Sequence, residues 1–481
     1  MKLGDEFMKD DKLSLTELVG LVIGSIIGGG IFNLMRDMAT PASAGSIIVG
    51  WVITAVGMIM LALCFQNLNM KRPDLDAGIY SYAEAGFGKY MGFNSAWGYW
   101  ISAWLGNVGY ATLLMSAVGY FMPVFKDGQN IYSIIVASLI LWGCHFLILQ
   151  GTKSASFINT VLTIAKLIPI GIFLVVMFIS FKIGIFTTDF WGTVSNHFEL
   201  KPVLSQVKGT MLVTVWVFIG IEGAVLFSGK AKKRSDVGKA TILGIITVIL
   251  IYMLVTLLSL GVMTRPELAN LRQPAMAYLL QSIVGKWGAV LVNLGLIISV
   301  AGAWLSWTMF AGQLPYEAAK NGTFPKFFAK ENQHHAPVNS LLLTNILIQI
   351  FFFTYLISSS AYNFFYSLAS SAILIPYAFS GFYQLKYSLK EDKATAGRKI
   401  NIIIGIVASI YACWLVYAAG MKYLLLTTLL FAPGIAFFYV MQKNDNHQTQ
   451  VFTHKELIIA GLIIVCAIWS LYLIFLGKIT F

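Results

Sequence analysis

The stretch that decides the fold is GSIIGGG, residues 24–30, which interrupts an apolar segment of membrane-spanning length. A second interruption, FIGIEG at residues 218–223, lies inside another such segment. In a bilayer every backbone N–H and C=O group needs a partner, so a broken helix is tolerated only against protein or a water-filled cavity. Breaks at corresponding positions of two repeats point to the substrate site of a transporter. The sequence therefore predicts that both breaks belong to one binding site.

The rest of the chain has the composition of a membrane protein. Of its 481 residues, 58% are hydrophobic and 11% are charged, against roughly 25% charged residues in an average soluble domain. Many apolar runs reach the ~20 residues that a helix needs to cross a bilayer, whereas an outer-membrane barrel would show short alternating segments. We therefore expect an all-α polytopic membrane protein.

Thirteen spans are predicted, with twelve as the alternative if two late segments pair as one re-entrant element. They are residues 16–35, 43–66, 91–122, 131–150, 156–181, 206–228, 238–263, 287–312, 338–357, 360–384, 400–420, 422–441 and 455–477. We divide the chain into a cytoplasmic tail (1–15), a transporter core (16–384) and peripheral C-terminal spans (385–481). Short helices are expected within 67–90 and, over the outer side of the site, within 265–285.

The basic residues indicate membrane topology rather than nucleic-acid binding. With the N-terminus in the cytoplasm, the inner loops hold about twice as many Lys and Arg as the outer ones, as the positive-inside rule requires. The net charge of +12 follows from this placement. The four cysteines lie in apolar runs without metal-ligand spacing, so they are interpreted as packing residues.

The first break is interpreted as a ligand cradle. Gly28, Gly29 and Gly30 remove three Cβ atoms in a row, which permits unusual backbone angles and close approach to a ligand. An unwound helix also exposes N–H groups that favour an anion such as a carboxylate. The structural alternative is close helix packing through small residues. Three consecutive glycines exceed what packing requires, so we favour the binding site.

Two ionisable residues fall inside predicted spans, where charge is expensive and usually functional. Glu222, in the second break, could pair with a substrate cation or carry a proton; its structural alternative is a hydrogen bond to exposed backbone. Lys166 lies too deep to reach the interface. It could carry a proton or serve as a fixed cation, and its structural alternative is a brace that pairs with carbonyl groups of a broken helix.

Sequence motifs of enzymes are not found. The three glycines follow no predicted strand, His334 and His335 lack metal-ligand spacing, and a P-loop is missing. We therefore expect neither an enzyme nor a cofactor or metal site. Aromatic side chains such as Trp216 would ordinarily be packing or interfacial residues in a chain with 12 Trp and 21 Tyr, but near a break they could stack on a cation.

Five motifs in order resemble the amino acid–polyamine–organocation (APC) superfamily, and within it the basic amino acid/polyamine antiporter family, most of all arginine/ornithine antiporters. They are VIGSIIGGGIF (22–32), DAGIYSYA (76–83), GYWISAWLGN (98–107), WVFIGIEG (216–223) and WTMFAGQ (307–313). The resemblance implies a LeuT-like five-plus-five inverted repeat with broken spans 1 and 6, and transport by alternating access.

The resemblance also implies roles for the residues of the breaks. Ser25, Ile27 and the glycines 28–30 would hold the α-amino and carboxylate groups of the substrate. Trp216 would be an aromatic gate, and Ile219 would contact the substrate through its backbone. Glu222 would be linked to proton release or gating.

Further positions follow from the same resemblance. Tyr99 and Asn107 match third-span positions, and Trp307 matches an eighth-span aromatic at the side-chain end of the substrate. Lys166 would stand where sodium-driven relatives bind an ion. Ser25 departs from the arginine/agmatine members, which carry asparagine there, so selectivity must come largely from spans 3, 8 and 10.

The sequence thus predicts a secondary antiporter in a bacterial cytoplasmic membrane that exchanges arginine, lysine or ornithine for a related amino acid or amine. Its expected partners are these substrates and the lipid bilayer, with protons and a second copy of the chain as further candidates and nucleic acid excluded. The alternatives are a proton-coupled importer of the same fold, a non-transporting amino acid sensor and an integral membrane enzyme.

Overall fold

The computed structural model describes residues 14–75, 78–151, 155–222, 234–356, 361–445 and 451–479. Across these ranges the regular structure is helical, with no β-strand. This confirms the all-α fold that the composition predicts. Parts of the motifs at residues 76–83 and 216–223, namely 76–77 and 223, lie outside the described residues.

The helices follow the predicted spans closely. Their bounds are α1 (Leu15–Ile26), η1 (Gly29–Phe32), α2 (Leu34–Ala39), α3 (Ala44–Lys71), α4 (Ile79–Phe87), α5 (Lys89–Phe121), η2 (Pro123–Phe125), α6 (Ile131–Leu149), α7 (Ala155–Ser180), α8 (Ile183–Thr188), α9 (Leu200–Phe218), α11 (Arg234–Leu260), α12 (Arg265–Ala269), α13 (Ala275–Val284), α14 (Lys286–Lys320), η4 (Lys326–Ala329), α15 (Val338–Phe352), η5 (Phe353–Leu356), α16 (Ala361–Lys390), α17 (Arg398–Asp445) and α18 (His454–Phe475).

Length and composition make the chain a multi-pass membrane protein. In the described part, nine helices are long and apolar enough to cross a bilayer. One of them, α17, has 48 residues, about 70 Å at 1.5 Å per residue and therefore more than twice the hydrocarbon thickness. Gly420, with φ of 77°, breaks it into two segments. These segments match the separate spans predicted at 400–420 and 422–441.

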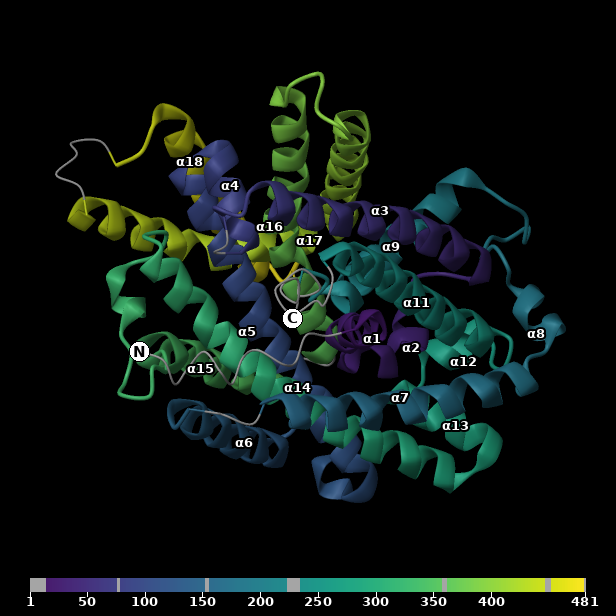
Figure 1. The fold of residues 1–481 in the computed structure, drawn as a ribbon. Coiled ribbons are helices and arrows are strands. Elements are labelled where there is room, and N and C mark those ends of the chain that lie inside the picture. The colour runs from purple at the N-terminus through teal and green to yellow at the C-terminus, as the bar shows by residue number, and fades with distance from the viewer. Residues whose placement is uncertain are drawn as a thin grey trace.

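The broken first span lies in the middle of the fold. In Figure 1, α1 and α2 lie beside α11, with α7 and α14 below them, while α18 lies away from this centre. The contacts agree, because α1 and α2 pack on α11, and α18 packs on α17. The short helix predicted within 67–90 is α4, and the helix predicted within 265–285 is divided into α12 and α13.

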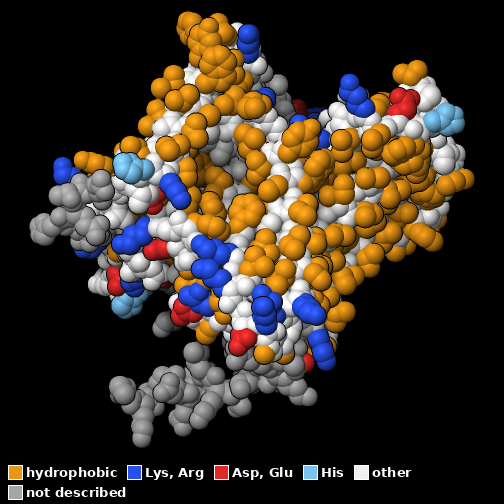
Figure 2. All heavy atoms as spheres, turned by 90° about the horizontal axis from the view of Figure 1, so that it is seen from above, with side chains coloured by type: hydrophobic (Ala, Val, Ile, Leu, Met, Phe, Trp, Pro, Cys, Tyr) orange, Lys and Arg blue, Asp and Glu red, His pale blue; other side chains and the backbone are white. Residues whose placement is uncertain are grey.

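Large hydrophobic side chains cover the outer surface. Leu139 of α6, Phe178 and Ile179 of α7, and Leu462 of α18 are all more than half exposed. Figure 2 shows a broad hydrophobic area on the face it presents, with Lys and Arg gathered on one part of it. Such a surface is stable against lipid rather than water.

Close packing between α3 and α17 gives a stability prediction. A Cβ atom at Gly57 would lie 2.2 Å from Cγ of Tyr411, and a ring atom so near the backbone cannot move aside. We expect Gly57→Ala to lower the free energy of unfolding by about 1–3 kcal/mol, measured by thermal unfolding in detergent. Gly461→Ala is the matched control, because nothing lies within 4 Å of a Cβ there. Equal unfolding temperatures for the two variants would contradict this contact.

Candidate functional site

The first break interrupts the helix where the sequence predicts it. The last backbone hydrogen bond of α1 runs from the N–H of Ile27 to the C=O of Ile23, at 2.9 Å. Ile27 and Gly28 then take extended backbone angles, and η1 starts at Gly29. The carbonyl groups at the end of α1 therefore need partners from outside the helix.

The second break lies directly against the first. Gly220 has φ of 104°, a left-handed conformation that glycine adopts readily. A Cβ atom at this position would lie 3.0 Å from the carbonyl oxygen of Ser25. The Tyr252 hydroxyl group of α11 is 3.0 Å from the Val217 oxygen and 3.3 Å from the Ile26 oxygen. One hydroxyl group thus lies between the ends of both broken helices.

A central cavity opens between the breaks. It is lined by Ser25, Ile26, Gly28, Gly30, Ser102, Gly106, Tyr110, Trp216, Val217, Ile219 and Trp307. Six of these residues are predicted binding residues: Ser25, Gly28, Gly30, Trp216, Ile219 and Trp307. The walls come from the two breaks and from α5, α9 and α14.

The three consecutive glycines have different surroundings. A Cβ atom at Gly28 would lie 2.9 Å from the Tyr110 hydroxyl oxygen, and one at Gly30 would lie 2.9 Å from Nε1 of Trp216. Gly29 instead faces Leu113 of α5 at the same distance. Two glycines therefore bring the backbone to the cavity walls, whereas Gly29 serves helix packing.

Trp216 is held by aromatic side chains of α5 and α16. Its indole N–H donates to the Tyr362 hydroxyl oxygen at 3.1 Å. Its ring stacks on Tyr366 with centroids 6.2 Å apart and an angle of 28° between planes, and Tyr110 is 5.9 Å away. Trp216 and Tyr110 line the cavity, whereas Tyr362 and Tyr366 support Trp216 without being among the lining residues.

Glu222 is fixed by three donors. The hydroxyl groups of Tyr99 and Tyr377 donate to its carboxylate oxygens at 2.5 and 2.7 Å, and the Gly220 N–H does so at 3.3 Å. Neither Glu222 nor Tyr99 is among the cavity-lining residues. The hydrogen bond to Gly220 is the backbone contact named as the structural alternative. Tyr377 is a partner that the sequence did not reveal.

Lys166 reaches the first break from α7. Its Nζ donates to the carbonyl oxygens of Gly24 at 2.7 Å and Ile27 at 2.5 Å. A cation at the C-terminal end of a helix also complements the helix dipole. The brace that the sequence analysis gave as the structural alternative is therefore present, and Ile27 contributes its carbonyl group to this brace rather than to the cavity.

Helix α5 supplies wall residues that the sequence analysis missed. Ser102, Gly106 and Tyr110 are four residues apart and so lie on one face of the helix. That spacing is a signal which could have identified them. The predicted residue Asn107 is fully buried beside this face but does not line the cavity, and neither amide atom has a hydrogen-bond partner in the described part.

Comparison with known proteins gives the family. Residues 13–465 match the amino acid permease family. The chain belongs to this family. It is 49% identical to an arginine/ornithine antiporter of Pseudomonas aeruginosa over 98% of each chain, and 44% identical to one of Latilactobacillus sakei over 97% of this chain and 98% of that one. It is also 42% identical to an arginine/agmatine antiporter of Chlamydia trachomatis over 97% of each chain.

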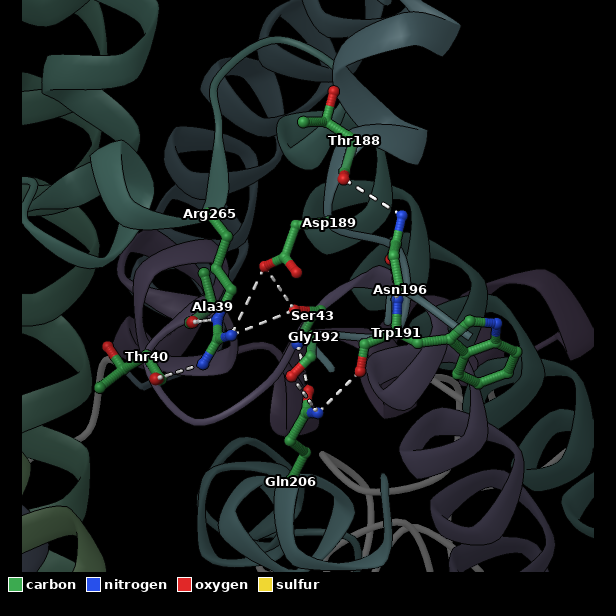
Figure 3. Close-up of polar contacts among 10 residues, drawn as sticks. All are labelled: Ala39, Thr40, Ser43, Thr188, Asp189, Trp191, Gly192, Asn196, Gln206 and Arg265. Carbon is green, nitrogen blue, oxygen red and sulfur yellow. Dashed lines mark hydrogen bonds and ion pairs between the residues drawn. The ribbon is translucent and has the colours of Figure 1, made fainter. Parts of the chain in front are cut away.

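The permease carries a polar clamp over one end of α3. The clamp consists of Arg265, Asp189, Ser43 and Gln206, with the backbone groups that they contact (Figure 3). Arg265 donates to the Ala39 oxygen at 3.1 Å and to Ser43 Oγ at 3.2 Å, and its guanidinium lies 3.6 Å from Asp189. Gln206 accepts from the Ser43 N–H at 2.8 Å.

Helices α12 and α13 are also fastened to α2. The Ala275 N–H donates to Asn33 Oδ1 at 2.8 Å, and Arg36 Nε donates to the Ala269 oxygen at 3.4 Å. Hydrogen bonds from Thr264 lower the pKa of the Glu267 carboxyl group at the start of α12. Together with Arg265, these contacts tie the second half of the broken span to α12 and α13.

The opposite end of α3 is tied to α16. Lys71 forms a salt bridge with Glu391, and Arg72 donates to the Tyr383 hydroxyl oxygen. Arg72 also pairs with Asp74 at 2.5 Å, a contact that lowers the pKa of that carboxyl group. The permease therefore has polar contacts at both ends of α3.

Proposed function

We propose that this permease is an antiporter that exchanges a cationic amino acid, such as arginine, lysine or ornithine, for a related amino acid or amine. The observation that carries the proposal is a cavity between two adjoining helix breaks, in a chain that is 49% identical to an arginine/ornithine antiporter over nearly its whole length. Arginine/agmatine antiporters among the relatives support an amine as the second substrate.

The residues around the cavity suit an amino acid. Backbone groups of Gly28 and Gly30 would bind the α-amino and carboxylate groups. Ser102 lines the cavity and its hydroxyl oxygen has no hydrogen-bond partner in the described part, so a substrate can satisfy it. The rings of Trp216 and Trp307 would stack on the cationic side chain.

Alternating access would open the cavity to one side at a time. In this proposal the spans form a LeuT-like pair of five-helix inverted repeats, with the N-terminus in the bacterial cytoplasm. The clamp on Arg265 and the contacts of Arg72 lie at opposite ends of α3. Each of these two sets of polar contacts would form in one state of the transport cycle and break in the other.

Exchange in liposomes tests the proposal. Purified protein is reconstituted in liposomes loaded with ornithine, and uptake of labelled arginine is followed. We expect rapid uptake into liposomes that contain ornithine and very little into empty liposomes. The reason is that the carrier of an obligate exchanger reorients across the membrane only with a bound substrate. Failure of internal ornithine, lysine, arginine or agmatine to stimulate uptake would exclude the proposal.

The second candidate function is a proton-coupled importer. It is favoured by two buried ionisable residues, Lys166 and Glu222. Empty liposomes with an imposed pH gradient distinguish it. Uptake driven by the pH gradient alone identifies an importer, whereas an obligate exchanger shows no uptake into empty liposomes.

Replacing Glu222 with glutamine tests a proton role at the second break. The amide fills the same space: its oxygen can accept from Tyr377 and Gly220, and its NH2 group can donate to the Tyr99 hydroxyl oxygen, but it cannot exchange a proton. We expect Glu222→Gln to flatten the pH dependence of exchange between about pH 5 and 8, while the unfolding temperature changes little. Exchange rates are measured across this range in reconstituted protein. An unaltered pH profile would assign Glu222 to a purely structural role.

A further inference from the structure

One buried carboxylate is not part of the central cavity. Asp37 of α2 has an exposed fraction of 3%, and its Oδ1 has no hydrogen-bond partner in the described part of the chain. It forms no salt bridge with a described residue: the neighbouring Arg36 attracts it through space, but Nε of Arg36 donates to the Ala269 oxygen. A buried carboxylate that has no salt bridge and leaves one oxygen without a donor is unfavourable for folding alone. Such a group is explained if it binds a cation during transport.

Other polar atoms without partners lie at the same junction. Asn33 is one turn before Asp37, and its Nδ2 has no described partner, although its Oδ1 accepts from the Ala275 N–H. Gln273 leaves Oε1 unpaired, while its Nε2 donates to Asn363 Oδ1 at 3.4 Å. We call Asn33, Asp37 and Gln273 the outer junction, because α2, the segment before α13 and the start of α16 meet there.

The outer junction is separated from the central cavity by aromatic rings. Asp37 lies within electrostatic range of Tyr362 and Tyr366 of α16. These same two side chains hold Trp216, one by a hydrogen bond and the other by stacking. Trp216 in turn lines the cavity beside Gly30. The path inward from α12 and α13 therefore passes Asp37, then the two tyrosines and Trp216, and ends at the cavity.

We propose that the outer junction is a second binding subsite, in which Asp37 receives the cationic end of the substrate before the substrate passes Trp216. This inference rests on the proposed exchange of cationic amino acids. An ammonium or guanidinium group offers several donors, and Oδ1 of Asp37 and Oε1 of Gln273 are acceptors that have no hydrogen-bond partner in the described part. The neighbouring tyrosine rings can add cation–π attraction. A neutral substrate would gain little from this site.

The nearby charged groups leave Asp37 available for this role. Arg265 of α12 is paired with Asp189, and Arg272, next to Gln273, is paired with Asp127 at 2.7 Å. Arg36, on the same helix as Asp37, is directed to a backbone oxygen of α12. The basic side chains of α2, α12 and the segment before α13 thus have other partners.

The experiment compares variants of Asp37 in reconstituted protein. We expect Asp37→Asn to raise the KM for external arginine about tenfold or more, since a charge at several ångströms is worth more than 1 kcal/mol in a partly buried site. The kcat should change less than the KM. Asp37→Glu, which keeps the charge, should restore most of the affinity. Inhibition by citrulline, the uncharged analogue of arginine, should be the same in wild type and Asp37→Asn.

Asp127→Asn is the matched control. It removes the same charge from the same side of the protein, but Asp127 is 54% exposed and paired with Arg272. We expect its KM for arginine to stay within about twofold of wild type, because Asp127 and the Arg272 that it releases are 54% and 59% exposed, and exposed charges are screened by salt. Thermal unfolding checks the fold, and Asp37→Asn should be at least as stable as wild type because it removes a buried charge.

Three results would overturn the inference: an unchanged KM in Asp37→Asn, an equal rise in Asp127→Asn, or a loss of kcat and stability without a change in KM. The last result would make Asp37 a structural residue. Failure of the proposed function is distinguishable, because wild-type protein would then show no exchange of arginine at all.

Discussion

Gly30→Ala is expected to reduce exchange strongly while leaving the protein folded. The added Cβ atom would lie 2.9 Å from both Nε1 of Trp216 and Cγ1 of Val217. Trp216 has little room to move, because Tyr362 binds its indole N–H and Tyr366 stacks on its ring. Overpacking of this kind amounts to about 1–3 kcal/mol, so kcat/KM for arginine should fall roughly tenfold to a hundredfold.

Gly20→Ala is the control for this variant. Gly20 lies in the same span, within α1, and nothing lies within 4 Å of a Cβ built there. We expect exchange at the wild-type rate from this variant, measured as labelled arginine uptake into ornithine-loaded liposomes. Wild-type kinetics in Gly30→Ala would show that Trp216 does not pack against the break during transport.

Lys166→Met is expected to slow turnover at least tenfold and to lower the unfolding temperature. The variant keeps the length of the side chain but leaves the Gly24 and Ile27 oxygens without the donor that reaches them from α7. An unsatisfied buried acceptor is unfavourable by about 1–3 kcal/mol, so two of them should loosen the end of α1 considerably.

Lys182→Met serves as its control, because Lys182 is an exposed lysine just beyond the end of α7. Turnover is measured by exchange and stability by thermal unfolding in detergent. If Lys166→Met is stable but loses only its response to pH, the lysine is a proton carrier rather than a brace. Normal turnover with normal stability would contradict both roles.

The sequence alone was enough to predict the helical fold and the helix breaks that form part of the site. Apolar runs of membrane-spanning length predict every long helix, since length and hydropathy decide whether a segment crosses a bilayer. Glycines 28–30 predict the first break for an equally local reason, because three residues without Cβ atoms weaken a helix wherever they occur. Gly220 predicts the second break in the same way, and its φ of 104° is a backbone conformation that glycine adopts readily.

Contacts between distant segments were harder to predict. Nothing near Glu222 in the sequence indicates that Tyr99 and Tyr377 bind its carboxylate, because these residues are 123 and 155 positions away. Asp37 was overlooked for a related reason. A single carboxylate after Met35 and Arg36 looks like the end of a span, and its burial depends on how α13 and α16 pack over it.

The two halves of the broken first span are anchored to different parts of the protein. Lys166 holds α1 to α7, whereas Asn33, Arg36 and Arg265 hold α2 to α12 and α13. Between them, Ile27 and Gly28 have extended backbone angles, and the hydrogen-bond ladder of α1 ends at the N–H of Ile27. Rotation about the backbone torsions of this joint need not break the hydrogen-bond ladder of either helix. Each half can therefore move with the part of the protein that anchors it, which suits a joint that must work in every transport cycle.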